Sequence, residues 1–467
     1  MFEAQFRAHS AQLQQAYDFM PHPIQNLLTS ARGWFLARNR YASGMYAQLK
    51  ELRSHEDWKA DQIRSYQVKA LQKVVDHARK TVPFYADYPS VQLQTPDDIA
   101  QYPVLTRETI RENADRLVSQ VTPQAARIRV GTTGTTGASL RVAYDQDTAR
   151  RNWAFHMRRW AWAGVEPRTP RVTLFGSRVI PPDRSCPPYW TENTVERQTL
   201  LSIFHMSENT APDYVSFLET QQDKVLEGFP SVLAILSDFV LRAGLSIPMR
   251  VVFTDGEPLY PFLRDSIERA FGTRVFDLYG NTEACGLIHE CQAGSMHAAP
   301  DYAYLEILGE DNEPVAVNQE GYLVWTGFVN ETMPLIRYRI GDRGCWGKTG
   351  CACGCNFPVV MPTITRESDL LRCPDGRVFS PRAVNQALKG ARRLRFCQIV
   401  HEQPGHVVVR GVASTQDAFE DLMAIRRNLQ QILGKRIAVS ATLADSPIVR
   451  AGGKIPLIVQ RTIPAAA

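Results

Sequence analysis

The stretch Val130-Gly131-Thr132-Thr133-Gly134-Thr135-Thr136-Gly137-Ala138-Ser139 has glycine at every third position and threonine at each position between the glycines. Glycine lets the backbone turn tightly and approach a ligand, and a run of free N–H groups forms a nest for anions. Such a loop suits the phosphates of a nucleotide. It is not a Walker A loop, because no Gly-Lys-Ser/Thr follows, and its spacing differs from the dinucleotide fingerprint. Taken alone, an ordinary surface loop explains the stretch equally well.

The composition is that of a globular protein of two or three domains, with 467 residues, 44% hydrophobic and 22% charged. A net charge of +5 is too small for nucleic-acid binding but suits anionic substrates such as nucleotides. No apolar run approaches the roughly 20 residues of a membrane span, and the first residues lack the apolar core of a signal peptide. Nine cysteines, an odd number, argue against a disulfide framework. We therefore expect a cytoplasmic protein with no transmembrane segment.

Residues 1–80 are predicted to be mostly helical, because apolar residues recur at helical spacing over Gln12–Met20, Ile24–Ala37 and Ile63–Thr81. A basic cluster with interleaved aromatic residues stands in this region, at Arg32, Arg38 and Arg40. Two interpretations are open. The cluster touches a membrane surface or a partner, or it belongs to a solvated helix that covers the larger domain, which is the commoner case.

Short apolar runs alternate with helical stretches through the centre of the chain, which is typical of an α/β sheet with crossover helices. The strands expected there are Arg171–Phe175, Val251–Thr254 and Val275–Tyr279, and the helices are Pro212–Gln222 and Leu263–Phe271. Leu305–Leu308 and Gly321–Thr326 are predicted as antiparallel strands of a smaller β unit. The last hundred residues predict a small α+β domain, with a strand over Val407–Val412 and a helix over Gln416–Leu433.

Three further motifs follow the loop: Tyr279-Gly280-Asn281-Thr282-Glu283, Tyr338-Arg339-Ile340-Gly341-Asp342 and Gly453-Lys454. In this order the four stretches resemble the signature of the adenylate-forming superfamily, from about Pro83 to Arg461. Within it the chain is similar to the phenylacetate–coenzyme A ligase group and its capsule-cluster relatives. The local features that carry this likeness are Val82-Pro83-Phe84-Tyr85, Phe204-His205-Met206-Ser207, Gly228-Phe229-Pro230-Ser231 and Cys351-Ala352-Cys353-Gly354.

The resemblance implies an α/β fold with a large, multi-subdomain adenylate-forming domain and a small, mobile α+β domain at the C-terminus. We expect a helical extension over residues 1–80 packed on the large domain, the large domain over 81–364, and the small domain over 365–467 with the late lysine. The family entry to the catalytic domain matches Pro103-Val104-Leu105-Thr106, where Thr106 would cap a helix. The family hinge matches Thr365-Arg366-Glu367-Ser368-Asp369, although Thr365 replaces the usual glycine.

In adenylation a carboxylate attacks the α-phosphate of ATP and expels pyrophosphate, so donors and cations must be aimed at the phosphoryl oxygens. The resemblance assigns Thr132, Thr133, Gly134, Thr135, Thr136 and Gly137 to the β- and γ-phosphates. Most relatives carry lysine after the last glycine, where this chain has Ala138, so the loop keeps its backbone cradle but has weaker electrostatics.

The resemblance gives the second motif three roles: Glu283 holds Mg²⁺ that bridges the phosphates, Thr282 meets the α-phosphate, and Tyr279 with Gly280 lies at the adenine. An alternative for this motif is a helix start capped by Asn281 or Thr282. Asp342 would accept the ribose hydroxyls, with a simple turn aspartate as the alternative. The resemblance also places the backbone of Gly256, Glu257 and Pro258 beside the base.

Lys454 follows a glycine pair, which suits a residue that reaches into a site from another domain. By resemblance it bridges the substrate carboxylate and the α-phosphate during adenylation. An ordinary solvated lysine is the alternative. We further expect the small domain to pivot at Asp369 between the two half-reactions.

Several cysteines and a histidine occur together late in the large domain. Soft sulfur and imidazole ligands in a group of four suit tetrahedral zinc, and several members of the ligase group have a similar set. The expected ligands of a structural zinc are Cys291, His297, Cys351 and Cys353, with Cys285 and His289 as competitors for the first two. Buried free thiols are the alternative.

The sequence thus predicts an ATP- and Mg²⁺-dependent, AMP-forming ligase that activates a carboxylic acid, by default an aryl or arylacetic acid, and passes it to coenzyme A. A ligase that uses an amine or hydroxyl acceptor is the first alternative. An inactive nucleotide-binding regulator is the second, although it would have no need for Lys454. A homodimer is common in the group and is a further possibility.

Overall fold

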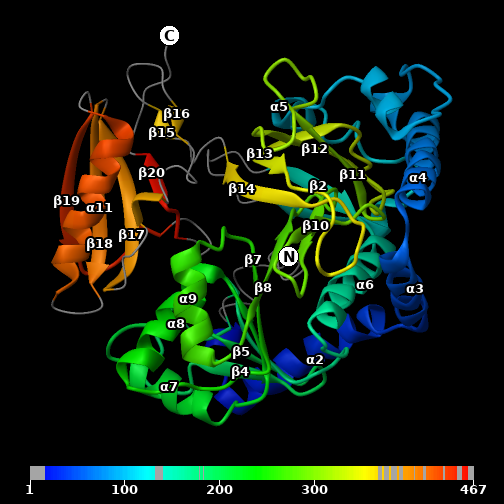
Figure 1. Cartoon of the computed structure of the whole chain (residues 1–467). Coiled ribbons are helices and arrows are strands. Elements are labelled where there is room, and N and C mark those ends of the chain that lie inside the picture. The colour runs from blue at the N-terminus through cyan, green and yellow to red at the C-terminus, as the bar shows by residue number, and fades with distance from the viewer. Residues whose placement is uncertain are drawn as a thin grey trace.

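The computed structural model describes residues 16–131, 140–177, 179–181, 183–366, 371–372, 378–379, 386–388, 393–403, 405–413, 417–434, 437–449 and 455–460. Figure 1 shows a large N-terminal part beside a smaller C-terminal sheet covered by one helix. The mixed α/β class expected from the sequence is confirmed by the sheets and helices of both parts. Among the described residues, no helix combines the length and the apolar character that a membrane crossing requires.

Three helices lie on the outside of the large part: α2 (His22–Arg40) runs along its lower side in Figure 1, and α3 (Ser43–Ser54) and α4 (Ala60–Thr81) stand on its right. The predicted helices over Ile24–Ala37 and Ile63–Thr81 are confirmed, whereas residues 12–15 of the first predicted helix lie outside the described residues. A buried ion group ties this region to the rest of the protein. Asp301 accepts from Nη1 of Arg158 at 2.6 Å and lies 2.8 Å from Nδ1 of His55. Burial alone would raise the pKa of Asp301, but Arg158 and His55 outweigh it and lower that pKa.

An eight-stranded sheet forms the centre of the large part, in the order β10-β9-β8-β7-β6-β3-β5-β4. Pairs from β8 to β5 are parallel, and the two edges, β4 and β9–β10, are antiparallel. The alternating pattern therefore predicted this sheet correctly. Its strands are β3 (Arg171–Leu174), β4 (Trp190–Asn193), β5 (Gln198–Leu201), β6 (Val225–Gly228), β7 (Val251–Asp255), β8 (Val275–Gly280), β9 (Leu287–Glu290) and β10 (Met296–Ala298), and its helices are α6 (Gln146–Trp162), α7 (Ala211–Glu219), α8 (Pro230–Arg242) and α9 (Pro261–Phe271).

A smaller antiparallel sheet, β11-β12-β13-β14, lies above the large sheet in Figure 1 and includes both stretches predicted as antiparallel strands. Thr106 caps the helix α5 as expected, since its side chain accepts from the N–H of Thr109. The elements of this region are α5 (Arg107–Glu112), β1 (Ile128–Gly131), β2 (Arg141–Tyr144), β11 (Ala303–Leu308), β12 (Gly321–Gly327), β13 (Tyr338–Trp346) and β14 (Val360–Arg366). Short 3₁₀ helices span His55–Asp57, Pro83–Tyr85, Pro96–Gln101 and Gln124–Ala126.

The C-terminal part is a four-stranded sheet, β19-β18-β17-β20, with α11 packed on it around its own core. The predicted strand over Val407–Val412 and helix over Gln416–Leu433 correspond to β18 and α11. The large part contacts the C-terminal part at two places. Phe262 packs against this core, and Asp238 of α8 pairs at 2.6 Å with Arg395 of β17. The elements are β15 (Leu371–Arg372), β16 (Val378–Phe379), a 3₁₀ helix (Gln386–Leu388), β17 (Leu394–Gln403), β18 (His406–Ala413), α11 (Ala418–Leu433), β19 (Ala438–Ala444) and β20 (Ile458–Gln460).

Candidate active site and cysteine–histidine cluster

Two motifs far apart in the sequence meet at the end of β8. The hydroxyl of Tyr279, in β8, donates a 2.8 Å hydrogen bond to Oδ2 of Asp342, in β13. The pairing of β12 with β13 is interrupted opposite this point, and Gly341 has a φ of +92°, which favours glycine. A bulge of this kind redirects the side chain that follows it. Burial, reinforced by the charge of Asp342, raises the pKa of Tyr279 well above its ordinary value, so the tyrosine stays a donor.

Glu283 lies in the turn that follows β8, and its carboxylate is buried. Oε1 accepts from the hydroxyl of Tyr338 at 3.3 Å, and Nη1 of Arg107 lies 3.9 Å away. Burial, then the charge of Glu283, raises the pKa of Tyr338 well above its ordinary value. Thr282 is half-buried in the same turn. Tyrosine hydroxyls therefore hold both motif carboxylates, Glu283 and Asp342, at one edge of the two sheets.

The alternative of a helix start at Asn281 or Thr282 is wrong. Residues 281–286 form a turn that leads directly into strand β9. Oδ1 of Asn281 accepts from the N–H of Cys285 at 3.0 Å, which closes the turn without a helix. Gly286 is required by close packing, because a Cβ there would lie 2.5 Å from the ring of Trp325.

The predicted adenine-side segment follows β7. Gly256 has a φ of +76°, and Glu257 accepts from the N–H of Ser231 at the start of α8, at 3.1 Å. Beneath it, the fully buried Arg159 donates to the carbonyls of Thr254 and Phe276 at 2.7 and 2.8 Å. Arg159 thereby links the end of β7 to the first part of β8.

The glycine–threonine loop residues Thr132–Gly137, with Ala138 and Ser139, lie outside the described residues, as do Lys454 and Asp369. The flanks of the loop are described: β1 and β2 pair antiparallel, and Gly131 faces Arg141. The neighbour of the lysine is also described. The N–H of Ile455 donates to Oε1 of Glu257 at 3.1 Å, so the residue after Lys454 contacts the predicted adenine-side segment.

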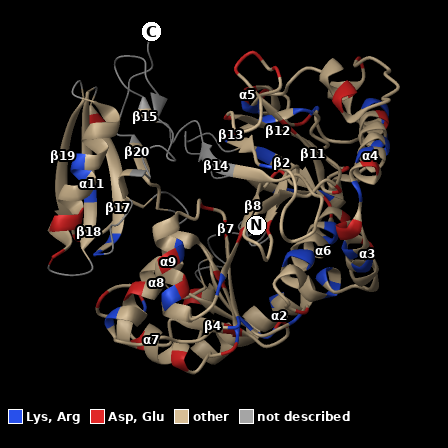
Figure 2. Cartoon of the chain, viewed as in Figure 1, with Lys and Arg blue, Asp and Glu red and all other residues tan. Residues whose placement is uncertain are grey.

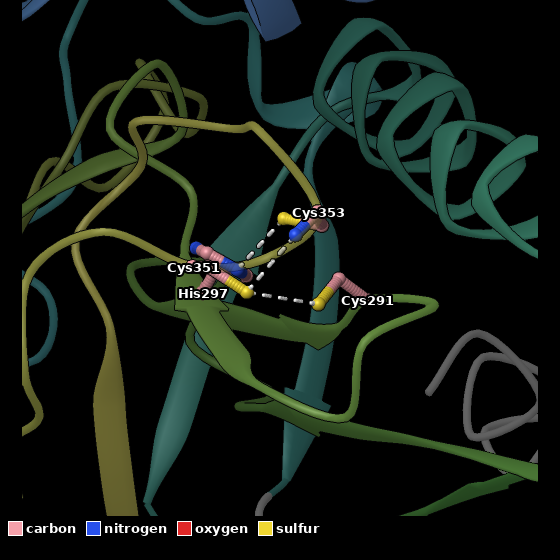
Figure 3. A group of neighbouring side chains, drawn as sticks. All are labelled: Cys291, His297, Cys351 and Cys353. Carbon is pink, nitrogen blue, oxygen red and sulfur yellow. Dashed lines mark hydrogen bonds between the residues drawn. The ribbon is translucent and has the colours of Figure 1, made fainter.

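The four expected metal ligands come together at the other edge of the large sheet (Figure 3). Cys291 follows β9, His297 is in β10, and Cys351 and Cys353 lie in the connection between β13 and β14. Their ligand atoms all lie within 4.8 Å of one another. Neither competitor belongs to this group of four. Cys285 bonds with Asn281, and His289, although it pairs with His297 across β9 and β10, packs edge-on against Trp162.

The spacing of these atoms fits a tetrahedral metal. Zinc–sulfur bonds of about 2.3 Å would hold two sulfurs about 3.8 Å apart, and Sγ of Cys291 and Sγ of Cys351 are 3.7 Å apart. Nε2 of His297 lies 3.4 Å from Sγ of Cys353, while Nδ1 lies 2.8 Å from the carbonyl of Phe357. That carbonyl accepts a hydrogen bond from Nδ1–H, which leaves the unprotonated Nε2 as the ligand, as in most histidine–zinc sites.

Thiolate formation is favoured at Cys351, whereas burial raises the pKa of Cys353 to about 12. Partial burial alone would raise the pKa of Cys351, but hydrogen bonds from Ser295, the N–H of Cys353 and His297 outweigh it and lower that pKa to about 6. Thiolates are the form that binds metal. The donor set, the distances and the lowered pKa of Cys351 all fit zinc.

Three residues near the motif strands and carboxylates were not singled out from the sequence. Arg107, directly after the helix cap Thr106, lies 3.9 Å from Glu283. Trp325 stacks beside Tyr279 with ring centroids 6.2 Å apart. Arg159 donates to the carbonyls of Thr254 and Phe276. A buried arginine on an otherwise apolar face of α6 was the available signal for Arg159, because a buried charge needs partners.

Comparisons with known proteins agree with this geometry. No family model matches the chain. It is 26% identical to protein CapK of Staphylococcus aureus over 340 residues, covering 71% of this chain and 72% of CapK. It is 22% identical to phenylacetate-coenzyme A ligase of Thermus thermophilus (67% and 72% covered) and 25% identical to that of Pseudomonas putida (60% and 66%).

Among solved structures, 2-hydroxyisobutyryl-CoA ligase in the postadenylation state, in complex with R3-HIB-AMP, is similar with a TM-score of 0.69 and 19% identity, covering 87% of this chain and 91% of that one. An open conformation of the same ligase, with 2-HIB-AMP and CoA, gives a TM-score of 0.56. Together with the motifs that meet at β8 and β13, these likenesses show that the chain is similar to the phenylacetate–coenzyme A ligases and CapK and has the fold of an adenylate-forming CoA ligase.

Proposed function

We propose that this protein is an AMP-forming carboxylate ligase, which converts a carboxylic acid and ATP into an acyl-adenylate and pyrophosphate and then transfers the acyl group to coenzyme A. The observation that carries the proposal is the meeting of Tyr279 and Asp342 with Tyr338 and Glu283 at one edge of the two sheets. The named relatives that are phenylacetate-coenzyme A ligases support an aryl or arylacetic acid as the substrate.

Asp342 accepts the ribose hydroxyls. Its carboxylate suits this role, because the hydrogen bond from Tyr279 to Oδ2 holds the group in a fixed orientation. Tyr279 and Gly280 line the adenine together with Gly256, Glu257 and Pro258. Arg159 holds the end of β7 at Thr254, so the backbone that leads into Gly256 is already fixed before the nucleotide binds.

Glu283 would hold Mg²⁺, since a buried carboxylate with one oxygen oriented by Tyr338 suits a hard cation. The ion neutralises charge on the phosphates when it is bound. Thr282 donates its hydroxyl to the α-phosphate from the same turn, and the loop from Thr132 to Gly137 wraps the β- and γ-phosphates with backbone N–H groups. Lys454 neutralises charge that develops between the carboxylate and the α-phosphate.

The contact of Ile455 with Glu257 supports the assignment of Lys454, because it joins the segment that follows the lysine to the predicted adenine-side segment. A structural zinc on Cys291, His297, Cys351 and Cys353 would join the β9–β10 hairpin to the connection between β13 and β14. We assign the protein to the cytoplasm, where ATP and coenzyme A are available, and a homodimer stays a prediction.

The test is carboxylate-dependent exchange of labelled pyrophosphate into ATP across a panel of aryl, arylacetic, hydroxy and short aliphatic acids. Exchange with an acid shows adenylation, and thioester formation on adding coenzyme A shows the acceptor. Exchange without thioester would favour an amine or hydroxyl acceptor. The absence of exchange with every acid, in protein that binds ATP, would favour the regulator and contradict the proposal.

A further inference from the structure

The helix α2 packs against the rest of the protein with its polar face. An amphipathic helix usually packs with its apolar face. Helix α2 lies along the edge strand β4. Oδ1 of Asn26 accepts from the N–H of Glu192 at 3.0 Å, and the hydroxyl of Ser30 donates to the Glu192 carbonyl at 3.2 Å. Arg40 pairs with Glu196 at 2.9 Å. The contact is close, because a Cβ on Gly33 would lie 2.1 Å from the amide of Asn193.

The opposite face of α2 is apolar and open to solvent. Phe35 is 68% exposed and Leu27 67% exposed, and Phe19 just before the helix is 89% exposed. Six of the thirteen exposed large hydrophobic residues in the described ranges lie within this short segment: Phe19, Ile24, Leu27, Leu28, Trp34 and Phe35. The five that belong to α2 lie within about a third of the circumference of a helix with 3.6 residues per turn. Monomeric proteins rarely expose such a continuous patch unless it binds something.

The charge of this segment is uniformly positive. From Phe19 to Leu49 the chain contains Arg32, Arg38 and Arg40 and no aspartate or glutamate. In Figure 2 α2 runs along the lower side of the large part, and its own sequence contributes basic but no acidic positions. The exposed Arg38 lies over the ring of Trp34, with its guanidinium carbon 4.8 Å from the ring centroid.

We infer that the exposed face of α2 docks the protein onto an anionic lipid surface. Trp, Phe and Leu on one face of a helix with arginines beside them are the composition of helices that lie in the membrane interface. Anionic headgroups complement Arg32 and Arg38, while the apolar side chains enter the boundary of the acyl chains. The polar face is already bonded to β4, so the helix stays attached to the large domain.

A second copy of the chain fits this face less well. A two-fold contact through α2 would place the same surface on both subunits, and the arginines of one copy would meet those of the other with no acidic residue of the segment to compensate. The observations therefore favour a lipid surface over self-association.

The experiment is co-sedimentation of the full chain with phosphatidylcholine vesicles, with and without phosphatidylglycerol. We expect binding only with phosphatidylglycerol, and weaker binding at high salt. The double variant Trp34→Ser with Phe35→Ser should bind at least about tenfold more weakly, because two large apolar side chains are removed, and Arg38→Gln about fivefold more weakly. Matched controls are Phe419→Ser and Arg427→Gln on α11, which are also exposed and should bind like the unaltered chain.

Three outcomes would overturn the inference. The first is no binding to either vesicle type. The second is equal binding by the double variant and the unaltered chain. The third is a concentration-dependent dimer, measured by sedimentation velocity without lipid, that the double variant abolishes, since this would identify a second copy as the occupant. Pyrophosphate exchange with a soluble acid should be the same in all variants, which separates this test from that of the proposed function.

Discussion

The carboxylates near the end of β8 and the sulfur cluster beyond β9 both join the large sheet to the region of β13 and β14 but are held in different ways. Tyr279 and Tyr338 already orient Asp342 and Glu283 in the protein alone. In the cluster, Cys291, Cys351, Cys353 and His297 mainly face one another. The carboxylate edge is therefore preorganised by the protein, whereas the cluster needs a cation to offset its thiolates.

The comparison separates two kinds of residue. Substitutions at the carboxylate edge should reduce catalysis and leave the fold stable, because the tyrosines and strands remain. Substitutions in the cluster should reduce stability and metal content first, because a metal held by the four side chains would cross-link β9 and β10 to the connection between β13 and β14. The experiments below test this division.

Lys454→Ala carries the largest expected effect. Adenylation, measured by pyrophosphate exchange, should fall about a thousandfold, because a cation aimed at the developing charge is lost. Thioester formation from a supplied acyl-adenylate should fall less than about tenfold. Lys80→Ala is the matched control, because Lys80 is an exposed lysine on α4 and is far from Lys454 in the sequence. Equal loss of both half-reactions would contradict the separate role of the lysine in adenylation.

Asp342→Ala comes next. The KM for ATP should rise about a hundredfold, because a charged acceptor contributes roughly 1.5–3 kcal/mol to a hydrogen bond. The melting temperature should change little. Tyr279→Phe should raise the KM less, since it only loosens the orientation of the carboxylate. If Asp342→Ala unfolded the protein, the carboxylate edge would be structural and the comparison would fail.

Cys351→Ser tests the other side of the comparison. It should lower the zinc content of protein purified without chelator and cost about 2 kcal/mol of stability, a fall of several degrees in melting temperature. Cys186→Ser is the matched control, because that cysteine is exposed and outside the cluster. Metal analysis by mass spectrometry measures the first effect. A zinc-free parent protein with an unchanged melting temperature in the variant would end the zinc assignment.

Periodicity predicted the sheets well, because strands and crossover helices alternate with clear apolar runs. Strand order and register were beyond it. The bulge at Gly341, which directs Asp342 toward Tyr279, depends on how β13 pairs with β12. The positions of Asp342 and Glu283 came from motif resemblance, and the tyrosines that hold them could not be paired from the sequence because 55 and 63 residues separate the partners.

The long-range charge pairs and the orientation of α2 could not be predicted from the sequence either. Asp301 meets Arg158 and His55 across 143 and 246 residues, so no local pattern indicates the group. The apolar periodicity of α2 predicts a helix but favours its apolar face as the packed one. The structure places that face outward, because Asn26, Ser30 and Gly33 match the edge of β4 better than large side chains would.

The last prediction concerns Asp277, the carboxylate of β8 itself, which is buried and takes no part in the proposed ligand binding. It is buried two residues before Tyr279 and accepts from the hydroxyl of Thr254 at 2.6 Å. Burial raises its pKa to about 6 even though the Thr254 hydrogen bond opposes the shift, and the charge of Glu290 adds to it. Because the unfolded pKa is about 3.9, the folded state binds the extra proton between about pH 4 and pH 6. Stability is therefore lost as the pH rises through this window, by up to about 3 kcal/mol.

Asp277→Asn mimics the protonated form and should remove this loss. Urea unfolding should show equal stability of the variant and the unaltered chain near pH 4 and greater stability of the variant above about pH 6, by no more than about 3 kcal/mol. The matched control, Asp265→Asn, removes an exposed carboxylate on α9 and should leave the pH dependence unchanged. A variant less stable than the unaltered chain at pH 7 would mean that Asp277 acts as a needed anion for Arg159 or Arg264. The carboxylates of β8 and β13 would then belong to one charged network, and the distinction between preorganised ligand groups and buried structural ones would not hold for this strand.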